Sequence, residues 1–138
     1  MKFLVLIIAL LYPLERYNST VLSIDNLDFT LGGQIKVQVY DKRFLQDGDA
    51  EAILEKTVKV SENCLPIALG ELPVGEYMIA IFHDGNVNGK MDYSFFGRPK
   101  EGYSFSGAFS CKTKSRGPAL HYVKFSEGFQ HVNVHLCY

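Results

Sequence analysis

The sequence predicts an all-β protein, a two-sheet antiparallel β-sandwich of the immunoglobulin-like or transthyretin-like kind, with about seven strands and one long loop. Short runs alternate between apolar and polar residues, and turn-forming Gly and Pro residues separate these runs. Eight Tyr and ten Phe suit a pleated sheet better than a helix. A chain of 138 residues, 47% of them hydrophobic, is sufficient for one domain with a single core.

The chain begins with a segment typical of an export signal. Lys2 precedes an uncharged apolar run over residues 3–14, and two charged residues follow it. A membrane-spanning helix needs about 20 apolar residues, whereas this shorter run suits a secretory signal peptide. We therefore expect a signal peptide over residues 1–19, with cleavage between 19 and 23, and a periplasmic or secreted domain over residues 20–138 without a transmembrane span. A first core strand or a membrane anchor is the alternative.

Two runs alternate clearly, residues 34–41 and 129–138, and each predicts a strand with one face in a core and one in water. Residues 77–82 are apolar on both faces, which indicates a strand at the centre of the packed sheets. Tyr103 to Phe105 can pair briefly. Weaker strand candidates are residues 21–27, 53–60, 65–69 and 121–125, and residues 47–52 can form a short helical turn.

The sequence contains three cysteines and does not determine which of them pair: Cys64, Cys111 and Cys137. An exported protein can form one disulfide bond from them, and the odd count then leaves one free thiol. Three ordinary half-buried thiols are the alternative, since the spacings match no zinc or redox motif.

After the central run the alternation stops until about residue 120, and a loop of this length is usually functional. Side-chain oxygens fall at Asp84, Asn86, Asn88 and Asp92, the first, third, fifth and ninth positions of a calcium loop, with glycine at the sixth. Lys90, at the seventh position, would contribute its backbone carbonyl. The carboxylate of the twelfth position is missing, so we expect any Ca²⁺ site to be weak, with a dissociation constant of about 10⁻⁴–10⁻³ M. An Asx-rich turn without metal is the alternative, because Asn and Asp also hydrogen-bond their own backbone.

Aromatic residues dominate the next part of the same loop. Such a cluster can line a groove for a sugar, a peptide or a Pro-rich segment, or it can form a small private core. We expect residues 84–106 to be the working surface for an unknown protein, glycan or small ligand of the cell envelope. The candidate contact residues are His83, Phe95, Phe96, Glu101, Tyr103 and Phe105.

The residues of this loop also form a long and specific pattern: His83-Asp84, Asn86, Asn88-Gly89-Lys90, Asp92, Phe95-Phe96-Gly97, P-K-E-G-Y over 99–103, and Phe105-Ser106. Together with L-P-V-G-E-Y over 72–77, Gly117-Pro118 and the closing alternating run, the pattern resembles a secreted bacterial family catalogued as domain of unknown function 2141. The resemblance implies an exported β-sandwich and implies no activity, cofactor or catalytic residue. Ser104 stands where a glycine is usual, and residues 111–114 replace a more usual polar run, which affects the expected path of the loop and not the fold.

The sequence favours a binding or interaction module over an enzyme. The pair His83 and Asp84 resembles a general base, but no Ser or Cys nucleophile elbow accompanies it. His131 and His135 share a strand face about 13 Å apart, too far for one metal ion. A net charge of −1 without clustered Lys or Arg argues against nucleic acid. The alternatives are a small hydrolase or isomerase that uses His83 and Asp84, and a transthyretin-like carrier of a small apolar ligand.

Overall fold

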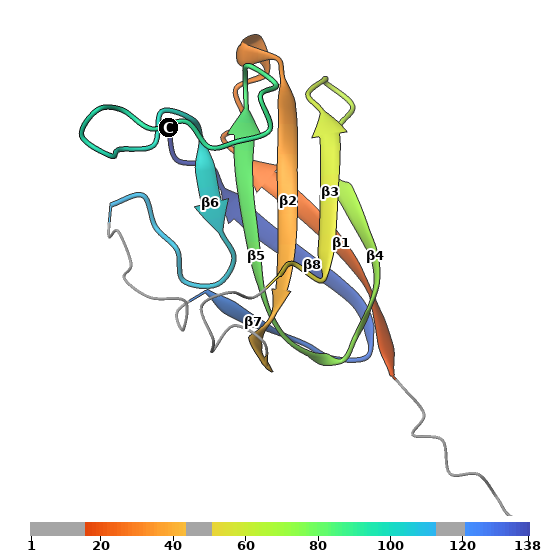
Figure 1. Ribbon diagram of the computed structural model, residues 1–138. Helices are drawn as coiled ribbons and strands as arrows, with labels where there is room; N and C mark the ends of the chain where they lie inside the picture. The colour runs from red at the N-terminus through yellow and green to blue at the C-terminus, as the bar shows by residue number, and fades with distance from the viewer. Residues whose placement is uncertain (1–15, 44–50, 113–120) are drawn as a thin grey trace, which may run out of the picture.

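Two β-sheets pack face to face in the computed structural model, which describes residues 16–43, 51–112 and 121–138 (Figure 1). One sheet has the strand order β4-β1-β8, and the other has the order β3-β2-β5-β6, with β7 also paired to β5. Neighbouring strands are antiparallel except for β1 and β8, which are parallel. The predicted all-β sandwich is confirmed. The strands are β1 (Tyr17–Asp25), β2 (Gln34–Asp41), β3 (Leu54–Lys59), β4 (Ile67–Pro73), β5 (Gly75–Asp84), β6 (Tyr103–Phe105), β7 (Tyr122–Phe125) and β8 (Gly128–His135).

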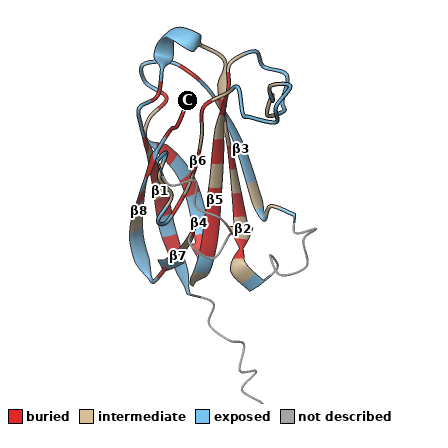
Figure 2. Ribbon diagram, turned by 90° about the vertical axis from the view of Figure 1, so that its left-hand side faces the viewer, coloured by how far each residue is buried: buried red, intermediate tan, exposed pale blue. Residues whose placement is uncertain are grey.

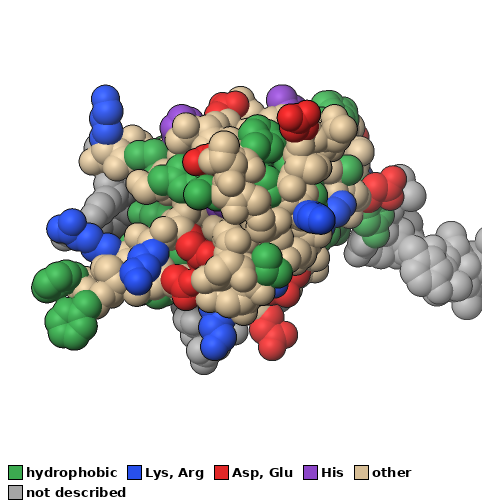
Figure 3. Space-filling view, turned by 90° about the horizontal axis from the view of Figure 1, so that it is seen from above, with side chains coloured by type: hydrophobic (Ala, Val, Ile, Leu, Met, Phe, Trp, Pro, Cys, Tyr) green, Lys and Arg blue, Asp and Glu red, His purple; other side chains and the backbone are tan. Residues whose placement is uncertain are grey.

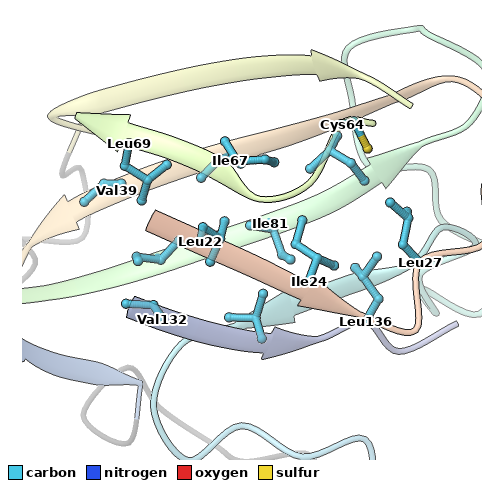
Figure 4. Packing of buried hydrophobic residues seen from close by; sticks show 14 of the residues in the cluster. Leu22, Ile24, Leu27, Val39, Cys64, Ile67, Leu69, Ile81, Val132 and Leu136 are labelled. Carbon is cyan, nitrogen blue, oxygen red and sulfur yellow. The ribbon is translucent and has the colours of Figure 1, made fainter. Parts of the chain in front are cut away.

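The core lies between the sheets and follows from the alternation in the sequence. In β1, β2 and the second half of β8, every second side chain points into the core, and Figure 2 shows the buried positions as red bands along the ribbons. Apolar side chains of both sheets meet there, as Figure 4 shows for Leu22 and Ile24 of β1, Ile81 of β5 and Val132 of β8. Burying one such side chain contributes about 1.5–3 kcal/mol, so this shared layer is what holds the two sheets together.

Strand β5 is the central strand, as its two apolar faces predict. It pairs with β2 along one edge, and its other edge is divided between β7, opposite residues 75–78, and β6, opposite residues 80–82. The brief pairing expected for Tyr103 to Phe105 is confirmed as β6. A further bridge joins Tyr103 to Cys137, just beyond β8, so the two sheets also touch at this margin.

Two local features differ from the expectation. A 3₁₀ turn, η1 (Phe29–Leu31), was not predicted, and the Asp28 side chain caps it by accepting a hydrogen bond from the Thr30 N–H at 2.9 Å. A single turn of this kind leaves no periodic apolar pattern in the sequence. The short helical turn expected over residues 47–52 falls mainly outside the described residues, and residues 51 and 52 are not helical.

The N-terminal strand begins earlier than the predicted domain boundary at residue 20. β1 starts at Tyr17, and the buried side chain of Asn18 donates a hydrogen bond to the carbonyl of Leu72 at 2.8 Å. Cleavage between residues 19 and 23 would therefore divide a paired strand. The signal peptide itself stays a prediction, since most of it lies outside the described residues. Within the described part of the chain, no helix has the length and apolar character needed to cross a membrane.

Candidate functional site

Strand β5 delivers the long loop to one end of the sandwich, where β2 begins and where the chain beyond β8 also arrives (Figure 1). The backbones come unusually close at this point. A Cβ atom on Gly33, which has a φ of +74°, would collide with the backbone of Asp84 and Gly85. Only glycine fits there, so the start of β2 and the start of the loop are fixed against one another.

Asp84 anchors the loop from inside. Its carboxylate is fully buried and accepts hydrogen bonds from the N–H of Asn88 at 3.0 Å, the N–H of Gly89 at 2.8 Å and the Gln34 side-chain amide at 2.7 Å. Burial raises the pKa of Asp84, but these hydrogen bonds, with a smaller effect from Lys36, more than offset it and hold the pKa below its usual value. The carboxylate is therefore ionised at neutral pH, and its charge organises the turn.

The asparagines of the loop form Asx turns. The side-chain oxygen of Asn86 accepts the Asn88 N–H at 3.1 Å, and that of Asn88 accepts the Lys90 N–H at 2.8 Å. Their amide groups both donate to the carboxylate of Asp92, at 2.6 Å and 3.0 Å. The structure thus brings together the five residues predicted for a calcium loop, and hydrogen bonds of side chains and of backbone N–H groups link them. A cation at their centre would have to replace the amide bonds to Asp92.

Glu101 closes the loop from its far end. One carboxylate oxygen accepts the Gly85 N–H and the other accepts the Asp92 N–H, both at 3.2 Å. A hollow of about 470 Å³ lies beside these groups, and Asn86, Asp92 and Glu101 contribute to its wall. Two carboxylates and an amide oxygen at one hollow are the donor set that a hard cation prefers. Among the described residues, however, no group of three or more His, Cys, Asp or Glu side chains is placed to hold a metal ion.

His83 holds the frame of the loop and does not pair with Asp84. Adjacent residues of a strand point to opposite faces. The imidazole is 1% exposed, with Nε2 at 2.6 Å from the carbonyl of Gly32 and Nδ1 at 2.8 Å from the hydroxyl of Tyr138. Both ring nitrogens are thus occupied, and the two side chains do not form the general-base pair that a hydrolase or isomerase would use. The ring edge borders the polar hollow.

A second depression, a groove of about 500 Å³, lies on the outer face of the five-stranded sheet. The outward side chains of β5 form its floor, because both faces of this strand are apolar. The loop forms one wall and β6 contributes Tyr103 and Phe105. The other residues around the groove are Gln38, Tyr40, Met78, Ala80, Ile81, Phe82, Gly89, Lys90, Met91, Tyr93 and Pro99.

The predicted contact residues therefore separate into three places. Tyr103 and Phe105 line the groove, while His83 and Glu101 lie at the polar hollow. Phe95 and Phe96 enter neither depression. The floor of the groove was not predicted from the sequence. The available signal was the apolar character of both faces of residues 77–82, which indicated burial, whereas the structure leaves the outer side of these residues partly open.

A private aromatic core does exist, but it involves only part of the loop. Tyr103, Phe105 and Phe109 contact one another edge-on or tilted, and His121 stacks on Phe105 with ring centroids 4.9 Å apart. Burial lowers the pKa of His121, and its Nδ1 is the one buried side-chain polar atom of the described residues that has no hydrogen-bond partner. This imidazole behaves as a member of the aromatic cluster.

The cysteine pairing left open by the sequence is resolved. Cys111 and Cys137 form a disulfide bond, and Cys64 is a free, buried thiol. The bond connects the segment after β6 to the residue whose backbone pairs with Tyr103. Strand β6, which forms one wall of the groove, is therefore held by its pairing with β5 on one edge and by its bridge to the disulfide-bonded Cys137 on the other.

The fold and the site define a class of protein: a small β-sandwich with one long loop that is held by its own hydrogen bonds and borders an aromatic groove. The chain belongs to the bacterial family DUF2141, described as "Uncharacterized protein conserved in bacteria", whose sequence model matches residues 23–135. The resemblance recognised in the loop residues is confirmed. Neither a curated protein nor a solved structure gives a significant match to the chain.

Proposed function

We propose that this protein is an exported binding module that holds a small ligand in the groove between the outer face of β5 and the loop of residues 84–106. One observation carries the proposal: a sheet face that would ordinarily be polar is apolar and aromatic, and it is hollowed to about 500 Å³. Ligand sites in proteins have volumes of about 300–1,000 Å³ and combine apolar walls with a few polar groups. The groove has this composition.

The side chains around the groove favour a ligand with a ring-shaped body and a negatively charged end. Tyr40, Phe82 and Tyr103 offer aromatic faces or edges against which a flat ring can pack. Lys90 supplies a positive charge at the loop wall and forms no ion pair with another described residue. A ligand acid could pair with this ammonium group, which would orient the ring along the strand.

Two features support export. The apolar segment over residues 3–14 has the length and flanks of a secretory signal. The disulfide bond between Cys111 and Cys137 suits an oxidising compartment such as the periplasm or the exterior, because disulfides rarely persist in the cytosol.

Calcium is part of the proposal as a weak stabiliser of the loop. The carboxylates of Asp92 and Glu101 border the polar hollow, next to Asn86. We infer that Ca²⁺ binds there by displacing the asparagine amides from Asp92, with a dissociation constant of about 10⁻⁴–10⁻³ M. The hydrogen bonds of Asp84 hold the turn in place without it.

The groove can be tested with the fluorescent probe anilinonaphthalene sulfonate, which has a ring system and one negative charge. We expect the native protein to bind it. Ala80→Phe, which fills the floor of the groove, should weaken binding at least about tenfold, because one lost apolar contact of aromatic size is worth at least about 1.4 kcal/mol. Ala68→Phe is the matched control, since Ala68 is exposed on β4 of the other sheet. No binding by the native protein, or equal losses in both variants, would overturn the proposal.

A further inference from the structure

The most exposed large apolar residues of the described structure are Phe95 and Phe96, which are 98% and 85% exposed. They occupy the two corner positions of a tight turn that the Gly97 N–H closes on the carbonyl of Ser94 at 2.8 Å. Corner positions of turns usually carry small or polar residues. Here the two rings contact each other edge-on at 5.5 Å and pack on nothing else described. Solitary exposed apolar residues are ordinary, but an adjacent pair at a turn corner indicates a contact surface.

The turn is held rigidly away from the sandwich. The Ser94 N–H donates to the carbonyl of Arg98 at 2.7 Å, and the Arg98 N–H donates to Ser94 Oγ at 3.1 Å. Tyr93 pairs with Pro99 in a short bridge below it. In Figure 1 this part of the loop, drawn in teal, projects sideways from the end of the sandwich. The exposure of the two rings therefore belongs to an ordered hairpin.

The basic and the acidic side chains around the turn differ in their surroundings. Lys90, Arg98 and Lys100 are exposed, and none of them forms an ion pair with another described residue. The carboxylates of Asp92 and Glu101 in the same segment accept hydrogen bonds within the loop and border the polar hollow, and that of Asp84 is buried. Viewed from above, hydrophobic side chains project beyond one edge of the molecule, beside Lys and Arg side chains (Figure 3). The tip thus presents apolar rings in a positive setting.

We propose that Phe95 and Phe96 form a membrane-docking tip, which inserts into the interface of an anionic phospholipid bilayer while Arg98 and Lys100 contact the headgroups. Peripheral anchors combine apolar side chains at headgroup depth with basic residues that attract anionic lipid, and both are present here. A specific protein interface covers about 800 Å² on each partner, far more than two side chains can supply. The inference extends the proposed function, because it uses the same loop but a surface outside the groove.

The test is binding of the full chain to vesicles of phosphatidylcholine mixed with phosphatidylglycerol, measured by co-sedimentation. We expect the native protein to bind these vesicles and to bind pure phosphatidylcholine more weakly. Phe95→Ser/Phe96→Ser should reduce binding by at least about tenfold, since each ring removed from the interface costs roughly that factor. Phe129→Ser is the matched control, because Phe129 is 68% exposed on β8 of the other sheet. Its replacement should leave vesicle binding unchanged. Arg98→Gln/Lys100→Gln should remove the preference for phosphatidylglycerol.

A second readout reports the insertion directly. The sequence contains no Trp, so Phe96→Trp introduces a single indole at the tip. Its emission should shift to the blue when the mixed vesicles are added, whereas that of Phe129→Trp should not move. Absence of vesicle binding by the native protein, or equal binding by the double-serine variant, would overturn the inference. Self-association that the double-serine variant abolishes without vesicles would also overturn it, and would assign the tip to a second copy. The double-serine variant should still bind anilinonaphthalene sulfonate, so failure here and failure of the groove are distinguishable.

Discussion

The hydroxyl of Tyr138 lies 2.8 Å from Nδ1 of His83, and it accepts a hydrogen bond from the Asp28 N–H at 3.0 Å. Nε2 of His83 faces the carbonyl of Gly32 and must carry a proton, so in the neutral ring Nδ1 accepts from the tyrosine. One chain of hydrogen bonds therefore joins the 3₁₀ turn, the end of β5 and the segment beyond β8. These are the three elements that frame the loop.

Replacing Tyr138 with Phe tests this frame. The variant loses one donor and one acceptor, and we expect the free energy of unfolding in urea to fall by about 0.5–1.5 kcal/mol. Tyr93→Phe is the control, because the Tyr93 hydroxyl is exposed and makes no hydrogen bond to a described residue. Its variant should differ from the native protein by less than about 0.5 kcal/mol. Equal losses in both would contradict the role assigned to Tyr138.

Asp84 should make stability depend on acid pH. Burial raises its pKa, but the hydrogen bonds from Gln34, Gly89 and Asn88 more than offset this, and the pKa lies below the ordinary value of 3.8. A carboxylate with a lowered folded-state pKa stabilises the fold above its unfolded-state pKa, and this contribution is lost as the pH falls through the folded-state value. The unfolding temperature of the native protein should therefore fall below a pH of about 4.

The variant Asp84→Asn should be less stable at neutral pH and should lose part of that acid dependence. The remaining part belongs to Asp28 and Asp41, whose pKa values are lowered mainly by side-chain hydrogen bonds from Thr30 and Arg43. Glu62→Gln serves as the control, because Glu62 is exposed in the turn before β4. An acid limb that is as steep in Asp84→Asn as in the native protein would count against this assignment.

His121 should act in a separate and milder pH range. Burial lowers its pKa from the ordinary 6.5, so as the pH falls below this value the imidazole takes up a proton more readily in the unfolded chain than in the folded one. The stability is then fully present above about pH 6.5 and decreases as the pH falls from there toward the folded-state pKa. His121→Phe keeps a ring stacked on Phe105 and should flatten the stability profile below about pH 6.5. His135→Phe, at an exposed position, should leave it unchanged.

The fold was predictable because burial and alternation coincide. In β2, residues Ile35, Val37 and Val39 are all fully buried, as their period of two requires. The order of the strands was not predictable, since the parallel pairing of β1 with β8 joins segments from opposite ends of the chain. Side-chain periodicity carries information on which face is buried, and none on which strand is the neighbour.

The candidate site was predictable only in part, for a similar reason. The spacing of Asp84, Asn86 and Asn88 correctly located the organised turn, because its hydrogen bonds are local in sequence. The groove combines Tyr40, Ala80 and Tyr103, which come together only through the pairing of β2, β5 and β6. The pairing of Cys111 with Cys137 also depends on that arrangement, because three cysteines allow several bonds.

Calcium should stabilise the protein modestly if it enters the polar hollow. With a dissociation constant of about 1 mM, calcium at about 10 mM would add roughly 1.4 kcal/mol and raise the unfolding temperature by several degrees. Asp92→Asn should abolish the shift, because it removes a carboxylate from the hollow. Asp25→Asn, at an exposed position of β1, should preserve it. Absence of a shift at millimolar calcium would remove the metal from the proposal.

The disulfide bond between Cys111 and Cys137 should be a major contributor to stability. It closes a loop with a sequence separation of 26, and a bond of this kind stabilises a folded chain by about 2–4 kcal/mol, mainly by restricting the unfolded chain. Reductant should therefore lower the urea midpoint of the native protein but not that of Cys111→Ser/Cys137→Ser. Thiol titration in denaturant should find one reactive cysteine, Cys64, without reductant and three with it. Three thiols before reduction would show that the bond does not form, and β6 would then be held by its pairing with β5 and by the backbone bridge between Tyr103 and Cys137.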